Sequence, residues 1–360
     1  MSRNSDIIIL LGAGASVQAN IPASQQMIEK IEERLKKHDW KTFADLYYLV
    51  KSSIVYASGL KGTFEIRDFY NVEVLVHTLS ELERRENHPI YPFISDWKSH
   101  LIQLADTNFD RIKQFRINIL NELKGWVQLD NESEADYFKG LKTLQHHLNY
   151  PLKIFSLNYD LCVERCDSEQ FRIESGFEQK GKKRVWDWRR FDESNPNQDV
   201  PQAFLYKMHG SIDWKRDEND NIVKTDDKGA RTPGDELPLI FGTDRKLEAG
   251  DPYLFYAYEF RRCTLDCKVI LCIGYGFGDG HINKMIKQAL KTEPAMRLVI
   301  VGNTKPEDVM AKATWVASKI QLDAKRIQVI PGTAKSFLED GNIGKKVTDL
   351  LPKEDANVPF

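Results

Sequence analysis

The stretch Asp6-Ile7-Ile8-Ile9-Leu10-Leu11-Gly12-Ala13-Gly14-Ala15-Ser16 decides how this chain should fold. Five consecutive apolar residues, three of them β-branched, are typical of a strand buried on both faces of a parallel sheet. The strand leads into Gly12 and Gly14, where glycine allows a tight turn and the close approach of a ligand to the backbone. A short helix-like run follows. Because free N–H groups and a helix dipole would point at one spot, the pattern predicts that Gly12, Ala13, Gly14 and Ser16 hold a nucleotide pyrophosphate. A plain tight turn from strand to helix is the alternative.

Five further apolar segments predict the remaining strands of this sheet. They are residues 152–157, 204–208, 268–273, 297–301 and 326–330. Ligands of an open parallel sheet bind outside the carboxyl ends of its strands. Several polar or small residues follow directly after these segments: Asn158, Asp160, His209, Ser211, Gly274, Asp279 and Asn303. So many such endings in one chain predict a single shared site.

A long region between the first two predicted strands shows helical periodicity only. We therefore predict an α/β fold in which residues 1–37 and 149–345 form a discontinuous Rossmann-like parallel sheet domain. Residues 38–148 form a large inserted all-helical module, and residues 346–360 form a C-terminal tail. A helix is expected from about Gln25 to Lys37, with Ser24 as its N-cap. A dinucleotide-binding dehydrogenase would have a second strand there that ends in an acidic residue. The predicted helix therefore disfavours the dehydrogenase class.

The composition is that of a soluble globular protein, with 360 residues, 41% of them hydrophobic and 29% charged. The net charge of −2 draws the chain neither to nucleic acid nor to a membrane. We see no signal peptide and no apolar run of about eighteen residues, so a cytoplasmic location is expected. The five cysteines include no CxxC pair, and we therefore expect no bound metal.

Taken together, the motifs resemble the sirtuin superfamily, and specifically bacterial sirtuin-like effectors that consume NAD⁺. The motifs that carry the resemblance are Gly12-Ala13-Gly14-Ala15-Ser16 with Ile21-Pro22, Leu157-Asn158-Tyr159-Asp160, Met208-His209-Gly210-Ser211, Gly274-Tyr275-Gly276-Phe277-Gly278-Asp279 with Ile282-Asn283, and Gly302-Asn303. The resemblance implies a Rossmann-like NAD-binding sheet with an inserted helical module. It also implies antiviral defence by NAD⁺ depletion, sometimes alongside a HerA-type translocase ATPase.

Two departures from the sirtuin deacylases argue against protein deacylation. Those enzymes carry four cysteines that hold a structural zinc beside the acyl-lysine cleft, and this chain has no such set. They also continue from Ile-Pro into an Asp-Phe-Arg segment, whereas Ile21-Pro22 continues here into Ala23-Ser24-Gln25. Cleavage of NAD⁺ itself does not depend on either feature.

The residue types at the strand ends suit cleavage of the bond between nicotinamide and ribose. Asn158 can hold a ribose hydroxyl or a water with both a donor and an acceptor atom. His209 can take a proton near neutral pH. Asp160 could orient either group or cap the turn after its strand, while Ser211, Asp279 and Asn303 are candidates for phosphate or ribose contacts. A core histidine and a turn asparagine are the alternative interpretations of His209 and Asn158.

These observations predict an NAD⁺ glycohydrolase that forms nicotinamide and ADP-ribose. An NAD-dependent protein deacylase and a non-catalytic module that senses NAD or ADP-ribose are the alternatives. Free NAD⁺ hydrolysis would poison the host, so we expect a homo-oligomer whose assembly controls the site, with a HerA-type ATPase as a candidate partner.

Overall fold

The computed structural model describes residues 6–66, 69–84, 99–106, 109–193, 199–225 and 250–352. They form two compact units. One unit contains the chain up to Ile21 and from Leu129 onward, and the other contains Pro22–Gln128. We call them the sheet unit and the helical unit and describe each by itself.

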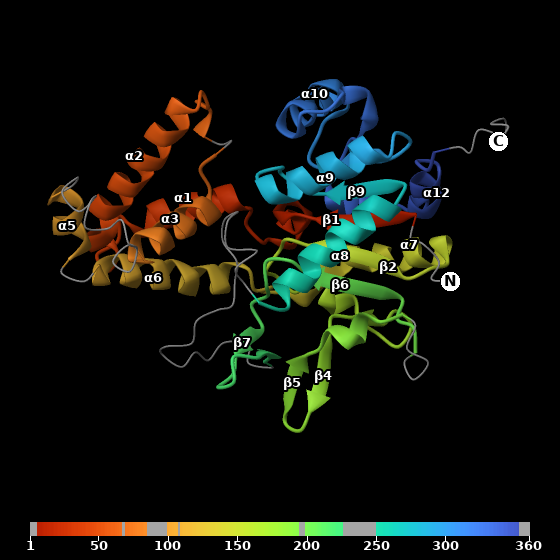
Figure 1. Ribbon diagram of the computed structural model, residues 1–360, viewed down its shortest axis with the longest axis horizontal. Coiled ribbons are helices and arrows are strands. Elements are labelled where there is room, and N and C mark those ends of the chain that lie inside the picture. Colours follow the sequence, from red (N-terminus) through yellow and green to blue (C-terminus); the bar gives the residue numbers. More distant parts are fainter. Residues whose placement is uncertain are drawn as a thin grey trace. The chain divides into compact units, whose positions relative to one another are not determined.

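The sheet unit is built on a parallel sheet with β1 near its centre (Figure 1). Seven strands of the described residues pair in the order β11-β10-β9-β1-β2-β6-β3, and each neighbouring pair runs parallel. Their bounds are β1 (Ile7–Leu11), β2 (Leu152–Ser156), β3 (Ile173–Glu174), β6 (Ala203–Lys207), β9 (Val269–Ile273), β10 (Arg297–Val301) and β11 (Ile327–Ile330). The predicted α/β Rossmann-like fold with a helical module is confirmed.

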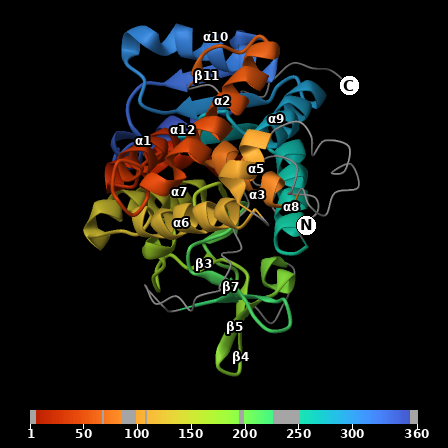
Figure 2. The ribbon, with the colours of Figure 1, turned by 90° about the vertical axis from the view of Figure 1, so that its left-hand side faces the viewer.

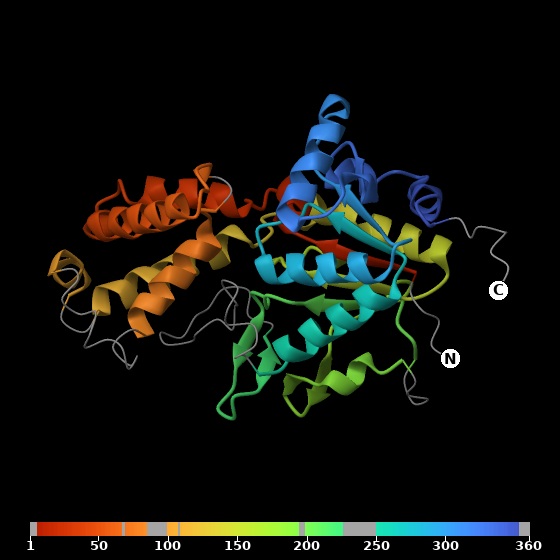
Figure 3. The ribbon, with the colours of Figure 1, turned by 45° about the horizontal axis from the view of Figure 1, so that its top comes forward.

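Helices cover the sheet, which explains why β1 is apolar at every position. Ile8 and Leu10 belong to one core cluster with residues of α8, α9 and α10, and α8 and α9 lie together on one side of the sheet (Figure 3). Because side chains alternate along a strand, Ile7, Ile9 and Leu11 point to the opposite face, and they are also fully buried. The longer helices of this unit are α7 (Gly140–Leu148), α8 (Tyr253–Asp266), α9 (Gly280–Thr292) and α10 (Val309–Ile320), and the shorter ones are α11 (Ala334–Leu338) and α12 (Ile343–Thr348).

The order of the strands reverses beside β1. The chain passes from β1 to β2 and β6 on one side, and later from β9 to β10 and β11 on the other. Such a switch point opens a crevice at the carboxyl ends of the flanking strands, where doubly wound sheets bind their ligands. The loops after β1, β2, β6 and β9 therefore surround the place where a site is expected.

A second, antiparallel sheet also belongs to this unit. Its strands, in the order β4-β5-β8-β7, are three or four residues long. The β4–β5 hairpin projects from the lower end of the sheet unit in Figure 2. The bounds are β4 (Phe177–Lys180), β5 (Lys183–Trp186), β7 (Trp214–Arg216) and β8 (Ile222–Lys224). Segments this short carry too few alternating residues to be recognised by periodicity.

The helical unit consists of amphipathic helices that bury their apolar stripes against one another. Helix α3 packs on α6, α1 contacts both, and α2 contacts α3 and α5. The rings of Phe43 and Phe115 stack 5.1 Å apart in this core. An ion pair of 2.7 Å joins Arg116 to Glu83 across α3 and α6. The described helices are α1 (Ser24–Arg34), α2 (Ala44–Leu60), α3 (Val72–Arg84), α5 (Ser99–Ala105) and α6 (Asp110–Trp126).

The first helix differs in detail from its prediction. Ser24 is the first helical residue rather than the N-cap, a position that Ala23 occupies. The side chain of Gln26 compensates, because its Oε1 accepts a hydrogen bond of 2.8 Å from the Ala23 N–H. The helix ends at Arg34, three residues before Lys37.

The two units do not share the boundaries of the predicted domains. Helix α1 groups with the helical unit because it packs on α3 and α6. The segment η7 (Glu132–Lys139) and α7 group with the sheet unit, because η7 contacts α11 and α7 packs on α12. The predicted tail, 346–360, begins inside α12, and its residues 353–360 lie outside the described part of the chain.

Candidate active site

Hydrogen bonds connect the loops that follow four neighbouring strands of the parallel sheet. The loop after β1 meets the loop after β9 through Gly14 N and Gly274 O, at 2.9 Å. It meets the loop after β2 through the side chains of Ser16 and Asn158. The loop after β6 is joined to the loop after β2 by the bond from Ile212 N to Tyr159 O, at 3.1 Å. It is joined to the loop after β9 by the contact between His209 and Asp279. The predicted shared site is thus a connected structure at the carboxyl edge of the sheet.

The glycine loop lacks the free N–H groups that the sequence predicted. Two single-turn 3-10 segments, η1 (Ala13–Ala15) and η2 (Val17–Ala19), follow it, and the first α-helix begins only at Ser24. The N–H groups of Gly12 and Gly14 donate to the carbonyl oxygens of Ile273 and Gly274. Those of Ala15 and Ser16 donate to Gly12 and Ala13. The prediction that these four amides are free N–H groups at the N-terminus of an α-helix is therefore wrong.

The glycines serve close packing of two backbones. A Cβ on Gly12 would lie 2.6 Å from the Cα of Tyr275, and one on Gly14 would lie 2.8 Å from the carbonyl oxygen of Gly274. Gly274 itself has a φ of +66°, and a Cβ there would lie 2.0 Å from the nitrogen of Ala15. The loops after β1 and β9 can touch only because all three residues lack side chains. This requirement is satisfied without any ligand.

Asn158 is buried at the end of β2 and is held from two directions. Its backbone N–H donates to the Ser156 hydroxyl at 3.2 Å, and its side-chain Nδ2 donates to the Ser16 hydroxyl at 3.1 Å. Its Oδ1 is also buried but has no hydrogen-bond partner among the described residues. A buried acceptor without a partner is costly, so this oxygen is suited to receive a bond from a water or a ligand hydroxyl.

His209 is fixed by a carboxylate rather than left as an isolated core histidine. Its Nε2 lies 3.2 Å from Oδ2 of Asp279, and both side chains are buried. An ionised carboxylate can only accept, so Nε2 is the donor in this contact. Asp279 also caps α9, because its Oδ1 accepts bonds from the N–H groups of His281 and Ile282. The prediction gave Asp279 a ligand contact and did not anticipate that it would orient His209.

The other predicted residues have mixed positions. The Oδ1 of Asp160 accepts a bond of 3.0 Å from Cys162 N, which is the turn-capping alternative of the prediction. Ser211 is fully buried, and its Oγ lacks a partner among the described side chains and backbone. Asn303 is exposed, and none of the hydrogen bonds found in the described residues joins it to the connected loops. Ala13 and Gly14 are half-buried.

Two residues that support these loops were missed by the sequence analysis. The hydroxyl of Tyr137, from η7, donates a hydrogen bond of 2.5 Å to the Ala15 carbonyl and so anchors the glycine loop. In the sequence, nothing distinguishes Tyr137 from a tyrosine of the helical core. Lys207 is a charged residue that ends the otherwise uncharged strand β6, yet it is 2% exposed. A lysine at the end of a buried strand is a signal that could have been noticed.

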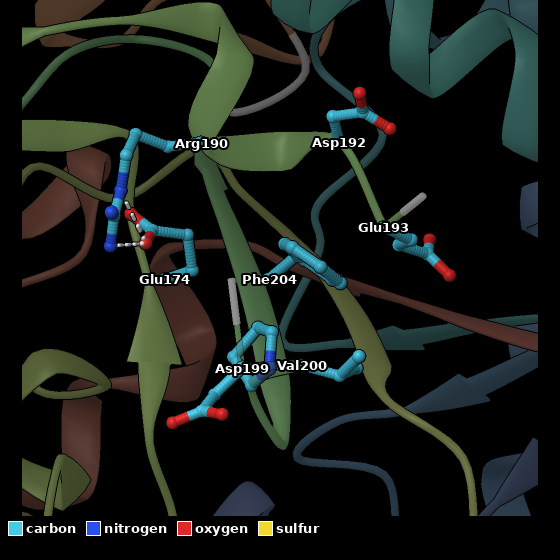
Figure 4. A pocket seen from close by; sticks show the side chains of 8 residues that line it. Glu174, Arg190, Asp192, Glu193, Asp199, Val200 and Phe204 are labelled. Atoms are coloured by element: carbon cyan, nitrogen blue, oxygen red, sulfur yellow. Dashed lines mark hydrogen bonds and ion pairs between the residues drawn. The ribbon is translucent and has the colours of Figure 1, made fainter. Parts of the chain in front are cut away.

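A small pocket elsewhere in the sheet unit does not include any predicted site residue (Figure 4). Phe204, the second residue of β6, lines it, so it lies toward the amino end of that strand. Its charged groups are engaged in ion pairs, such as Glu174 with Arg190 and Glu193 with Lys153. This pocket is therefore a surface depression lined by paired charges, and it is separate from the loops at the carboxyl edge of the sheet.

The backbone contact between the two glycine-containing loops predicts a stability effect. Gly274→Ala should destabilise the protein by about 1–3 kcal/mol, because it combines a strained positive φ with an overlap that side-chain motion cannot relieve. Gly276→Ala is the matched control, since a Cβ there meets no atom within 4 Å. Calorimetric melting of both variants without added ligand measures the difference. Equal melting temperatures would show that the contact does not constrain the fold.

Comparison with known proteins identifies the domain that contains most of these residues. Residues 152–330 match the family model of the SIR2-like domain, which confirms the predicted resemblance to sirtuins. No curated protein matches the chain. Among solved structures, a Sir2 homologue–NAD complex aligns over 95% of this chain and 89% of its own, with 11% identity and a TM-score of 0.43. A Sir2 homologue mutant bound to 2'-O-acetyl ADP-ribose aligns over 98% and 94%, with 12% identity and a TM-score of 0.40. The segment from 152 to 330 includes Asn158, His209 and Asp279, and the chain therefore contains a SIR2-like domain.

Proposed function

We propose that this protein is an NAD⁺ glycohydrolase, which cleaves NAD⁺ to nicotinamide and ADP-ribose. The observation that supports it best is the buried, unsatisfied Oδ1 of Asn158 on a loop hydrogen-bonded to the loop of the His209–Asp279 pair, within a SIR2-like domain. One group is suited to hold a hydroxyl or a water, and the other is suited to accept a proton.

The proposed reaction needs little from the protein at the leaving group. The C–N bond between ribose and nicotinamide breaks, and nicotinamide departs neutral because the bound ring is cationic. The transition state resembles an oxocarbenium ion, as in other glycosyl cleavages. A water oxygen forms the new bond to the ribose carbon, and its proton passes to Nδ1 of His209. The protein therefore acts by orienting ribose and water and by accepting that proton.

The remaining side chains have supporting roles in this proposal. Asp279 holds the His209 ring in the tautomer that leaves Nδ1 basic, as a carboxylate does for other catalytic histidines. The Ser211 hydroxyl, buried and without a partner in the described structure, is available to a ribose or phosphate oxygen. Gly12, Ala13, Gly14, Ser16 and Gly274 form the wall for the pyrophosphate. Asp160 shapes the turn, and Asn303 is an outer contact at most.

The two alternative functions make different demands. A deacylase would need an acylated peptide before it released nicotinamide, and a sensor would bind NAD⁺ or ADP-ribose without turnover. Incubation of the purified protein with NAD⁺ alone, followed by chromatography of the products, separates the three. Nicotinamide together with ADP-ribose supports the hydrolase, whereas intact NAD⁺ contradicts it.

Loss of either proposed catalytic side chain should abolish most turnover. We expect His209→Ala to reduce the rate of nicotinamide release about a hundredfold to ten-thousandfold, which is typical for removal of a general base. Asn158→Ala should give a comparable loss while NAD⁺ still binds. Since both residues serve one transition state, the double variant should lose less than the product of the two single losses.

His146→Ala provides the control for these variants, because His146 is exposed on α7 and lies outside the connected loops. It should keep the wild-type rate. Thermal melting shows whether the two catalytic variants are folded. Well-folded Asn158→Ala and His209→Ala proteins with near-wild-type release would contradict the assignment.

Metal analysis should find no stoichiometric zinc. Zinc binds thiolates, and burial raises the pKa of Cys166 to about 12 and that of Cys263 to about 11. In the described ranges no three His, Cys, Asp or Glu side chains are grouped to hold a metal ion. Elemental analysis of the purified protein tests this prediction. One zinc per chain would overturn it and would favour the deacylase.

We propose a role in antiviral defence by NAD⁺ depletion in the cytoplasm, and this proposal rests on the resemblance of the sequence motifs. None of the helices in the described ranges combines the length and hydrophobicity of a membrane span. Control of such an activity calls for assembly, either as a homo-oligomer or with a HerA-type ATPase. Light scattering during size-exclusion chromatography measures the assembly state. A fully active monomer at working concentration would contradict control by assembly.

A further inference from the structure

Lys207 is a buried cation beside the candidate active site that the proposed reaction does not use. It is the last residue of β6, two positions before His209, and it is 2% exposed. In the sheet it pairs with Ser156, the last residue of β2, so its backbone lies next to the strand that leads to Asn158. Lysine is seldom buried to this extent without a specific partner.

The Lys207 ammonium makes two contacts, both in the segment that follows Asn158. Its Nζ donates a hydrogen bond to the carbonyl oxygen of Asp160. It also lies 3.2 Å from Oε1 of Glu164, which begins the short segment η8 (Glu164–Cys166). Burial alone would lower the pKa of Lys207, but the nearby carboxylates of Glu164, Asp160 and Asp213 outweigh it and raise the pKa. Lys207 therefore remains charged at neutral pH.

The contacts of Lys207 complete the attachment of the Asn158 segment. Upstream, the Asn158 N–H is bonded to Ser156 within the end of β2. Downstream, the carbonyl of Tyr159 accepts a bond of 3.1 Å from Ile212 N, and the carbonyl of the next residue, Asp160, is held by Lys207. Asn158 is thus followed by two anchored carbonyls, and Lys207 holds the second of them. Since the position of its amide must match a ribose hydroxyl or a water closely, the downstream anchor matters for the chemistry.

We propose that Lys207 is a positioning residue, which sets the geometry of Asn158 by holding the Asp160 carbonyl and the Glu164 carboxylate. The proposed effect of Lys207 on catalysis rests on the proposed hydrolase function. Its proposed effect on the conformation of the segment after Asn158 does not. Lys207 touches neither substrate nor reacting atoms in this role.

Lys153 offers a matched control on the neighbouring strand. It lies on β2, is 5% exposed and forms an ion pair of 2.9 Å with Glu193. It therefore resembles Lys207 in burial and pairing but contacts none of the active-site loops in the interactions described here. Lys153→Met and Lys207→Met each remove a buried, paired ammonium. Only Lys207 contacts the segment that follows Asn158.

Hydrogen–deuterium exchange tests the structural part without any activity assay. In Lys207→Met, amides of residues 157–165 should exchange faster, while those of β9 and β10 should not change. Lys153→Met should leave residues 157–165 unchanged. Because removal of one partner leaves the Glu164 carboxylate buried and uncompensated, Lys207→Met/Glu164→Gln is the second variant, to be used if the single one does not fold. Unchanged exchange in residues 157–165 in the folded variant would overturn the proposal.

Kinetics of nicotinamide release test the catalytic part. Lys207→Met should reduce kcat by up to about a hundredfold with little change in KM, because the binding groups remain and only the alignment is lost. In an Asn158→Ala background the same substitution should have no further effect on kcat. An equal additional loss in that background would show that Lys207 does not act through Asn158. If the wild-type protein releases no nicotinamide, the proposed function fails, and the exchange result still decides the role of Lys207 in the segment.

Discussion

The contact between the backbones of the loops after β1 and β9 is the constraint on which the rest of this site depends. Gly14 N bonds to Gly274 O at 2.9 Å, and a side chain at either residue would overlap the other loop. This contact brings the turn after the central strand against the turn that leads to Asp279. Asp279, on the loop after β9, faces His209 on the loop after β6.

Burial gives the polar groups at this edge their chemical character. Asn158, His209, Ser211 and Asp279 are each less than a tenth exposed. In such surroundings every hydrogen bond is stronger, and every unmet one is more costly, than in water. The structure satisfies Nδ2 of Asn158 and Nε2 of His209 but leaves the Asn158 oxygen and the Ser211 hydroxyl without partners in its described part. The proposed function gives both of these unsatisfied groups a hydrogen-bond partner on the substrate or on water.

The same edge contains charges that work on the backbone rather than on a ligand. Lys207 binds a carbonyl and a carboxylate of the segment after β2, and Lys224 of the small sheet lies 3.4 Å from Asp213 of the segment after β6. Buried pairs of this kind contribute little net stability, because desolvation offsets their attraction. In the proposed function, their role is to hold the loops in one arrangement.

The sequence by itself determined the sheet and the loops that bear the site. Apolar runs such as Ile7–Leu11 and Val269–Ile273 are typical of strands buried in a parallel sheet, so these runs located every strand of that sheet except β3, and the residues that end them meet at one edge. Only the tertiary structure decided what those residues do there. It assigned Gly12 and Gly14 to backbone packing, paired Asp279 with His209 seventy positions away, and left Asn303 exposed. The reason is that strand propensity and burial are local properties of a few residues, whereas hydrogen-bond partners are chosen among side chains that only the folded chain brings together.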